Sequence, residues 1–149
     1  MCLYSAKKIT PEDDILVYKA LRVRKRNENL LTIKEYCSPY HWDTVWYFRE
    51  RKDIDASQPD LLPHVSPFGR DYYKIQGDAF HSFKDKERAL EEAGYLEHMH
   101  DEPVGVYVVG EFIIPKDSRY VYEGVYCASV SYASSSLVFN GLCKTTTKD

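Results

Sequence analysis

A long, largely apolar run in the second half of the chain predicts the central strand of a sheet. In residues 103–114 both alternating sets of side chains are mostly apolar, as expected for a strand that is covered on both faces. Pro115 ends this strand, because proline cannot donate a ladder hydrogen bond. Shorter runs of the same kind predict further strands, and these lie at 71–76, 79–83, 119–124 and 136–140.

A β-hairpin is predicted near the start of the chain. Residues 15–23 are rich in β-forming side chains, and a second strand follows at 30–36 after the turn-forming segment Asn27-Glu28-Asn29. A basic cluster precedes this turn. Its ordinary interpretation is a solvated hairpin tip, and its functional interpretation is an anion or phosphate site. The cluster consists of Arg22, Arg24, Lys25 and Arg26.

One short helix is predicted at about 85–93. Asp85 can cap its first turn, a thin apolar stripe follows, and Gly94 is a typical residue just after a helix end. A helix of this length is unstable alone in water, so we expect it to pack on the sheet.

Two segments are predicted to lack regular structure. Residues 52–69 contain three prolines and no periodicity, which indicates a long Pro-rich loop. Residues 1–13 are predicted to be a polar lead-in, and residues 144–149 a flexible tail. The fold class is therefore α+β: a single domain with a mainly antiparallel, twisted sheet and one packed helix.

Composition narrows the function classes. The 149 residues include 20 Lys and Arg against 23 Asp and Glu, which argues against a general nucleic-acid binder. The four cysteines show no zinc-site spacing, and no apolar run resembles a signal peptide or a membrane span. We therefore expect a cytoplasmic protein with reduced thiols and with neither a metal nor a cofactor.

Aromatic residues are abundant, with 13 Tyr, 6 Phe and 2 Trp. They indicate either a sheet with an aromatic face or a binding surface that uses rigid aromatic contacts. The same alternatives apply to residues 37–46, which can form a packed corner around Pro39 or a stacking platform for a base.

Short motifs follow one another along most of the chain. They are Met1-Cys2-Leu3-Tyr4, Val17-Tyr18-Lys19, Ser38-Pro39-Tyr40, Phe80-His81-Ser82-Phe83, Ile114-Pro115-Lys116, Ser118-Arg119-Tyr120 and Tyr132-Ala133-Ser134. In this order they resemble an uncharacterised family of small proteins from bacteriophages and Bacteroides-type mobile elements. The resemblance implies an accessory protein of viral or mobile-element origin that acts in a bacterial cytoplasm, and it implies no particular activity.

The order of the predicted elements also resembles ADP-ribosyltransferase-like folds, although less closely. That resemblance implies a catalytic set of Arg22, Ser82 and Glu123, and the wider hypothesis of a nucleotide-acting enzyme adds His81. The chain departs from the pattern because the first strand has no histidine, Ser82 lacks the usual Ser-Thr-Ser setting, and Val121 stands where a second acid is expected.

The leading hypothesis is a non-enzymatic protein that binds a host protein or a nucleotide-like ligand. A nucleotide would need an aromatic face for its base and arginine donors for its phosphates. The alternatives are a nucleotide-acting enzyme with the residues named above, and a structural or assembly protein. The candidate ligand-binding residues are Arg22, Arg24, Tyr40, Trp42, His81 and Arg119.

Overall fold

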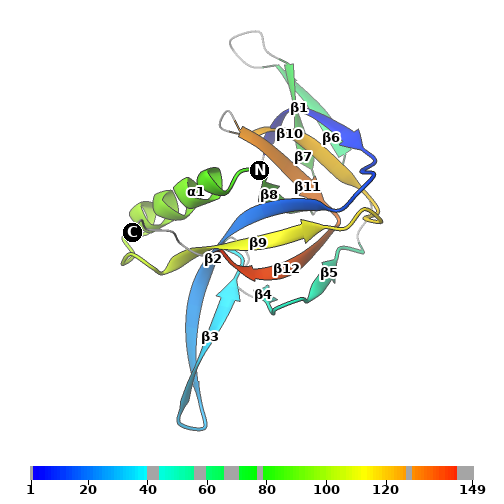
Figure 1. Ribbon diagram of the computed structural model, residues 1–149. Helices are drawn as coiled ribbons and strands as arrows, with labels where there is room; N and C mark the ends of the chain where they lie inside the picture. The colour runs from blue at the N-terminus through cyan, green and yellow to red at the C-terminus, as the bar shows by residue number, and fades with distance from the viewer. Residues whose placement is uncertain are drawn as a thin grey trace.

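An antiparallel sheet with one helix on its face makes up the described part of this computed structural model (Figure 1). The structure describes residues 2–39, 44–55, 60–65, 71–76, 79–126 and 129–143. Within these ranges the predicted α+β class and the mainly antiparallel sheet are confirmed. No helix in the same ranges combines the length and the apolar character that crossing a membrane requires.

Twelve strands and helix α1 are found in the described ranges. In chain order they are β1 (Cys2–Ile9), β2 (Ile15–Glu28), β3 (Leu31–Cys37), β4 (Val45–Trp46), β5 (Arg51–Asp53), β6 (Asp60–Val65), β7 (Asp71–Gln76), β8 (Phe80–Phe83), α1 (Lys86–Met99), β9 (Tyr107–Ile114), β10 (Val121–Tyr126), β11 (Ser129–Ser134) and β12 (Ser136–Leu142). The strand order is β5-β12-β9-β2-β8-β11-β10-β1-β7-β6, and β3 joins β2 to β4 outside this path.

Strand β2 is the longest of the described strands and belongs both to the body of the sheet and to the hairpin with β3. Its first eight residues pair with β9, from Ile15 opposite Ile114 to Arg22 opposite Tyr107. Its second half leaves the body of the sheet and pairs only with β3, so the predicted hairpin is confirmed (Figure 1). The hairpin turn lies at Asn29 and Leu30, slightly later than the sequence predicts.

The two faces of β2 contribute to two cores. Val17 and Leu21 pack with Trp46, Phe112 and neighbouring apolar residues on the face away from the helix. On the other face, Ala20 and the β8 residue Phe83 pack against the buried side of α1. Successive residues of β2 face opposite sides of the sheet, and both sides are covered by a core. This is why apolar residues occur in both alternating sets of the strand.

The N-terminal segment is not the polar lead-in predicted from the sequence. Residues 2–9 form β1, which pairs with both β10 and β7, and Leu3 and Ala6 are buried. The register shifts between Tyr4 and Lys7, as in a β-bulge, so the buried positions are three residues apart instead of two. This irregular spacing concealed the strand in the sequence.

The Pro-rich segment at 52–69 is not one continuous loop. Strand β5 extends into it, and β6 occupies residues 60–65, while residues 56–59 and 66–69 lie outside the described ranges. Strand β6 contains Pro63 and lies at the end of the sheet order. An edge strand tolerates proline because one side of its backbone needs no ladder partner.

Helix α1 is longer than predicted, and Gly94 does not end it. The buried side of the helix continues through Leu96, and the helix ends at Met99. A Cβ at Gly94 would meet no atom within 4 Å, so this glycine lies on the solvent side within the helix. The predicted packing on the sheet is confirmed, because α1 contacts β9, β2 and β8.

Strands β2 and β8 meet at a narrow seam. Their register contains a single pair, Tyr18 opposite Phe83, and the Lys19 ammonium reaches across to donate a hydrogen bond to the His81 carbonyl at 3.0 Å. Part of the Lys19 side chain reaches solvent, but its ammonium lies in this packed seam. Burial there lowers the pKa of Lys19 to about 8, and Glu92 on α1 acts in the opposite direction.

Replacing Lys19 with methionine should change the pH dependence of stability. Because the pKa of Lys19 is about 8 when folded and 10.5 ordinarily, the unfolded chain binds more protons between these values. The contribution of Lys19 to the free energy of unfolding should therefore rise with pH in that window, by at most about 1.4 kcal/mol per pH unit. Urea unfolding of the wild type and Lys19→Met from pH 7 to 10.5 measures this difference. Lys116→Met, at an exposed lysine, is the control for removing a surface charge, and a pH-independent difference for Lys19→Met would contradict the buried position of its ammonium in the seam.

Two glycine-to-alanine variants should change stability in opposite directions. A Cβ at Gly110 on β9 would lie 2.8 Å from Phe112 Cε2, 2.9 Å from Leu21 Cδ1 and 3.0 Å from Phe139 Cε1. We expect Gly110→Ala to destabilise the fold by about 1–3 kcal/mol through overpacking. Gly94→Ala should stabilise it by about 0.5–1 kcal/mol, because alanine favours the helix. The urea concentration at the midpoint of unfolding is measured for the wild type and both variants. Equal shifts of the midpoint in the two variants would contradict the packing at Gly110 and Gly94.

Candidate interaction surface

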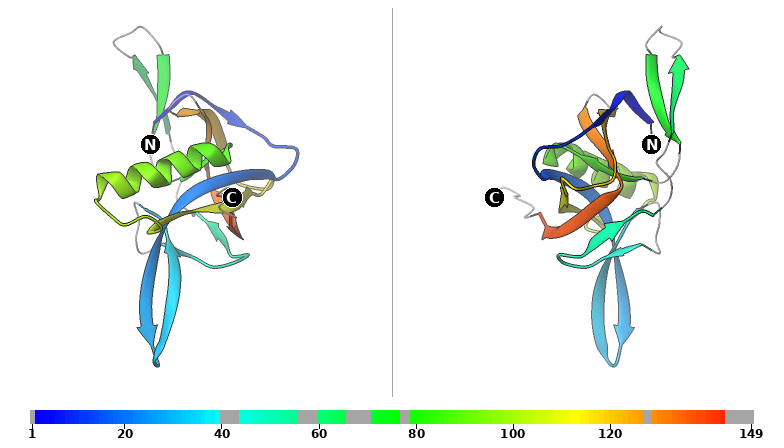
Figure 2. Two further views of the ribbon diagram at one scale, coloured as in Figure 1. Left: turned by 60° about the vertical axis from the view of Figure 1, so that its left-hand side comes forward. Right: turned by 90° about the vertical axis from the view of Figure 1, so that its right-hand side faces the viewer.

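The outer halves of β2 and β3 form a two-stranded arm that projects from the body (Figures 1 and 2). We define the arm as residues 24–35. All its side chains are exposed except Ile33, which is half-buried, and Glu35, which is buried. The arm carries four cations and two carboxylates, whereas the whole chain has a net charge of −3. The projecting element is therefore the basic part of an acidic protein.

The tip of the arm is a tight turn with an unusual residue. Asn29 and Leu30 both have positive φ, +52° and +66°, as the two-residue turns of hairpins require. Asparagine adopts this conformation readily, but for leucine the left-handed conformation costs about 1–2 kcal/mol. The Leu30 side chain is fully exposed, and its neighbour Leu31 is 67% exposed. Folding stability therefore does not explain the choice of leucine at position 30.

One face of the arm has compensated charges. The carboxylate of Glu35 accepts hydrogen bonds from Arg24 Nη2 at 3.1 Å and Arg24 Nε at 3.3 Å, and Arg26 Nε lies 3.5 Å from it. The hydrogen bond with Glu35 is the main cause that raises the pKa of Arg24. Arg26 also pairs with Glu28 at 2.9 Å. These contacts stiffen the arm where it leaves the body.

The opposite face carries cations without such compensation. Lys25 lies directly opposite Lys34 in the ladder, and like charges in this position destabilise a hairpin. Within the described ranges neither lysine has an ion pair with a carboxylate. Next to them, Thr32 Oγ1 donates a hydrogen bond to Asn27 Oδ1 at 3.1 Å. This face is positive and otherwise polar.

An exposed aromatic turn lies near the base of the arm. Residues 47–50, which we call the aromatic turn, begin with Tyr47 and Phe48, which are 57% and 62% exposed. Backbone bonds close the turn from Glu50 to Tyr47 and join Arg49 to β12. Because Trp46 lies opposite Tyr36 in the ladder between β3 and β4, Tyr47 follows next to the Glu35 end of the arm. The aromatic turn and the arm therefore belong to one surface.

Trp46 anchors this surface to the core. Its indole N–H donates to Ser38 Oγ at 3.1 Å, and its ring meets Phe112 and Phe80 edge-on, with centroids 5.0 and 5.4 Å away. Because Trp46 pairs with Tyr36 in the ladder, β3 and the aromatic turn are held in register by one buried residue.

The residues of the transferase hypothesis occupy separate environments. Arg22 pairs with Glu102 at 3.2 Å and lies over the Tyr107 ring. Ser82 and Glu123 lie in one cross-strand row, but Tyr132 stands between them and the Ser82 side chain is fully buried. Burial, together with the electrostatic interaction and a hydrogen bond with Glu123, raises the pKa of Tyr132 to about 12. His81 is adjacent to Ser82 and therefore faces the other side of the sheet.

Other sequence candidates differ in outcome. Arg24 lies at the base of the arm, where it pairs with Glu35, whereas Arg119 lies at a separate pocket. Tyr40 and Trp42 lie outside the described residues. Within the described ranges, no group of three or more His, Cys, Asp or Glu side chains could hold a metal ion.

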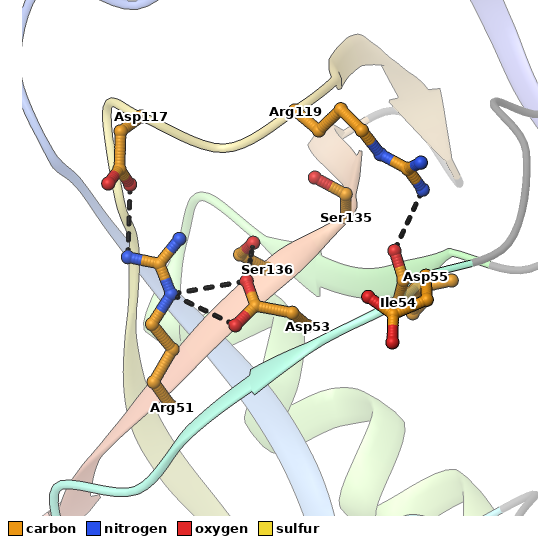
Figure 3. A pocket seen from close by; sticks show the side chains of 8 residues that line it. All are labelled: Arg51, Asp53, Ile54, Asp55, Asp117, Arg119, Ser135 and Ser136. Carbon is orange, nitrogen blue, oxygen red and sulfur yellow. Dashed lines mark hydrogen bonds and ion pairs between the residues drawn. The ribbon is translucent and has the colours of Figure 1, made fainter.

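The pocket around Arg119 measures about 300 Å³ and lies where β5 meets β12 (Figure 3). Arg51 Nε donates to Asp53, and Arg51 Nη1 donates to Asp117 Oδ1 at 3.0 Å. Arg119 Nη2 donates to the Ile54 carbonyl at 2.8 Å. Asp53 also accepts a hydrogen bond from Ser136, and this bond is the largest cause that lowers the pKa of Asp53. These contacts join an edge strand to the turn after β9, so they serve the fold.

Sequence reasoning missed the apolar residues of the interaction surface. Leu30 and Leu31 fall in the strand predicted at 30–36, and the sequence pattern does not distinguish Tyr47 and Phe48 from the aromatic residues before them. A signal was present in the run Asn29-Leu30-Leu31, because a hairpin turn favours glycine after asparagine.

Comparisons with known proteins identify no relative. No protein-family model, no curated protein and no solved structure matches this chain. The candidate surface therefore rests on its geometry and chemistry.

Replacing Leu30 with glycine should stabilise the protein. Glycine adopts positive φ without steric cost, so we expect Leu30→Gly to raise the free energy of unfolding by about 1 kcal/mol. Leu30→Ala retains a Cβ and should give no such gain. Urea unfolding of the three proteins measures the effect. A loss of stability in Leu30→Gly would show that the exposed leucine contributes to the fold itself.

Proposed function

We propose that this chain is a non-enzymatic binding protein that engages a partner protein through the arm and the aromatic turn. The observation that carries this proposal is Leu30, which is fully exposed at the arm tip in a conformation unfavourable for leucine. Natural sequences tolerate such local cost where function requires it. Leucine and aromatic side chains that project from a stiff support are suitable anchors for an apolar groove.

The proposed biological setting comes from the family resemblance of the short motifs. It supports an accessory protein of viral or mobile-element origin that acts in a bacterial cytoplasm. A host protein, one of the two partners that the leading sequence hypothesis names, is then the natural partner. The structure adds a specific surface to that hypothesis, with apolar anchors at the tip and base and basic residues between them.

The alternative functions have weaker support. A transferase needs its arginine, serine and glutamate to converge on a substrate, whereas Ser82 is buried and Arg22 is engaged by Glu102. A nucleotide at Arg119 would have to compete with the hydrogen bond to the Ile54 carbonyl and with three neighbouring aspartates. Assembly through the same arm remains an outcome of the experiment below.

Site-specific crosslinking tests the proposed function. A photoreactive phenylalanine analogue placed at Leu30, and separately at Tyr47, should capture the same protein from a Bacteroides lysate. Tyr95 on α1 is the matched control, because it is 55% exposed and Tyr47 is 57% exposed. We expect no capture of that protein from position 95.

The captured protein must then bind in purified form. Since truncating an anchor residue costs more than about 1.4 kcal/mol, Leu30→Gly should weaken the affinity at least tenfold. This variant retains a folded arm, so the loss would report on contact. Equal capture from Tyr95, an unchanged affinity in Leu30→Gly, or capture of a second copy of this chain would each contradict a host-protein partner.

A further inference from the structure

The outer edge of β3 has room for another strand. Strand β3 pairs with β2 along its whole length, but with β4 only at Tyr36 and Cys37. Within the described ranges, residues 31–35 of β3 therefore have no ladder partner on the outer side. Beyond the paired part, Ser38 N–H donates to the Thr44 carbonyl, which shows that even-numbered residues direct their backbone outward here.

The backbone groups at this edge can be assigned from the same alternation. Odd-numbered β3 residues bond to β2, so Thr32 and Lys34 direct their N–H and C=O groups to the open edge. Exposed edges of this kind are templates for strand addition. A strand that pairs with these residues would extend the short ladder between β3 and β4.

The side chains at this edge specify the charge of the added strand. Lys34 and its cross-strand neighbour Lys25 lie on one face of the arm and repel each other. A strand beside β3 with carboxylates on that face would relieve the repulsion and gain charge-assisted contacts. Arg24 and Arg26 are occupied by Glu35 and Glu28 on the opposite face, so the two lysines dominate the recognition.

From this arrangement we propose that the partner adds an acidic, extended segment to the outer edge of β3 at Thr32–Lys34. The segment alternates acidic and apolar residues, with its carboxylates toward Lys25 and Lys34. This inference rests on the proposed function and names the class of partner. The apolar anchors at Leu30 and Tyr47 then flank the added strand.

A nucleic-acid duplex fits this edge less well. Its affinity depends on the number of phosphates neutralised, and the arm offers two cations that are not paired to carboxylates within the described ranges. The rest of the molecule is acidic and would repel phosphates, because the chain is negative overall while the arm is positive.

A defined peptide tests the proposal. The probe is an acetylated nonapeptide of alternating valine and glutamate, and its counterparts are alternating valine and lysine and a 12-base-pair DNA duplex. Amide signals of the intact protein are followed by NMR during titration, together with hydrogen exchange at Thr32 and Lys34. We expect the acidic peptide to bind and to protect both amides, with an affinity that falls as salt rises.

Lysine variants separate charge recognition from nonspecific attraction. The Lys25→Gln, Lys34→Gln double variant should lose about tenfold or more in affinity for the acidic peptide. Its matched control is Lys84→Gln, Lys116→Gln, which changes the net charge equally at exposed lysines outside the arm. Thr32→Pro removes one outward N–H and should abolish the protection at Lys34, while exchange at β2 amides confirms an intact arm.

Each outcome bears on the proposal. No binding of the acidic peptide, binding that leaves the Thr32 and Lys34 amides unprotected, equal losses in both double variants, or tighter binding of DNA would overturn it. The partner captured by crosslinking distinguishes the two proposals. If Leu30→Gly weakens the binding of that partner and the Lys25→Gln, Lys34→Gln variant does not, the proposal of edge addition fails while the proposed function stands.

Discussion

The pairing of β2 with β9 is the constraint on which the rest of the molecule depends. Eight consecutive residue pairs hold the first half of β2 between two cores, and the strand continues without a break into the arm. The direction of the arm is therefore set by a strand that is packed on both faces. A long projecting hairpin would otherwise be only marginally stable in water. The body fixes the base of the arm through this ladder, and most side chains of the arm take no part in a core.

The same strand also determines where the sheet is weakest. On the side opposite β9, β2 meets β8 through a single residue pair and the Lys19 bond to a carbonyl. Helix α1 contacts strands on both sides of this seam and so compensates for the missing ladder. Packing across one face holds the sheet together there. The Lys19 ammonium donates a hydrogen bond to the His81 carbonyl where backbone hydrogen bonds between the two strands are few. Helix α1 is therefore needed to support the seam, even though its apolar stripe is modest.

The sequence predicts most of the regular fold, and the failures have local causes. Alternation identified β9 and the β2–β3 hairpin, because these strands keep a strict period of two. It missed β1, where a bulge interrupts the period, and β6, where an edge strand carries Pro63. It also ended α1 at Gly94, since sequence alone does not reveal that Leu96 is buried by a distant strand layer.

The candidate site was less predictable than the fold for a physical reason. Catalytic and ligand residues are sought among charged and aromatic side chains, and several of those in this chain serve the structure. Arg22 and Arg119 are held by neighbouring groups, and Ser82 is interior. Two features of the described residues cost stability and have no evident structural role: a leucine with positive φ at a turn tip and two lysines that face each other. Both features are unfavourable in the isolated protein, and both are accounted for by the apolar, acidic partner that we propose. A residue that costs free energy alone is therefore a better guide to the proposed binding surface than residue type.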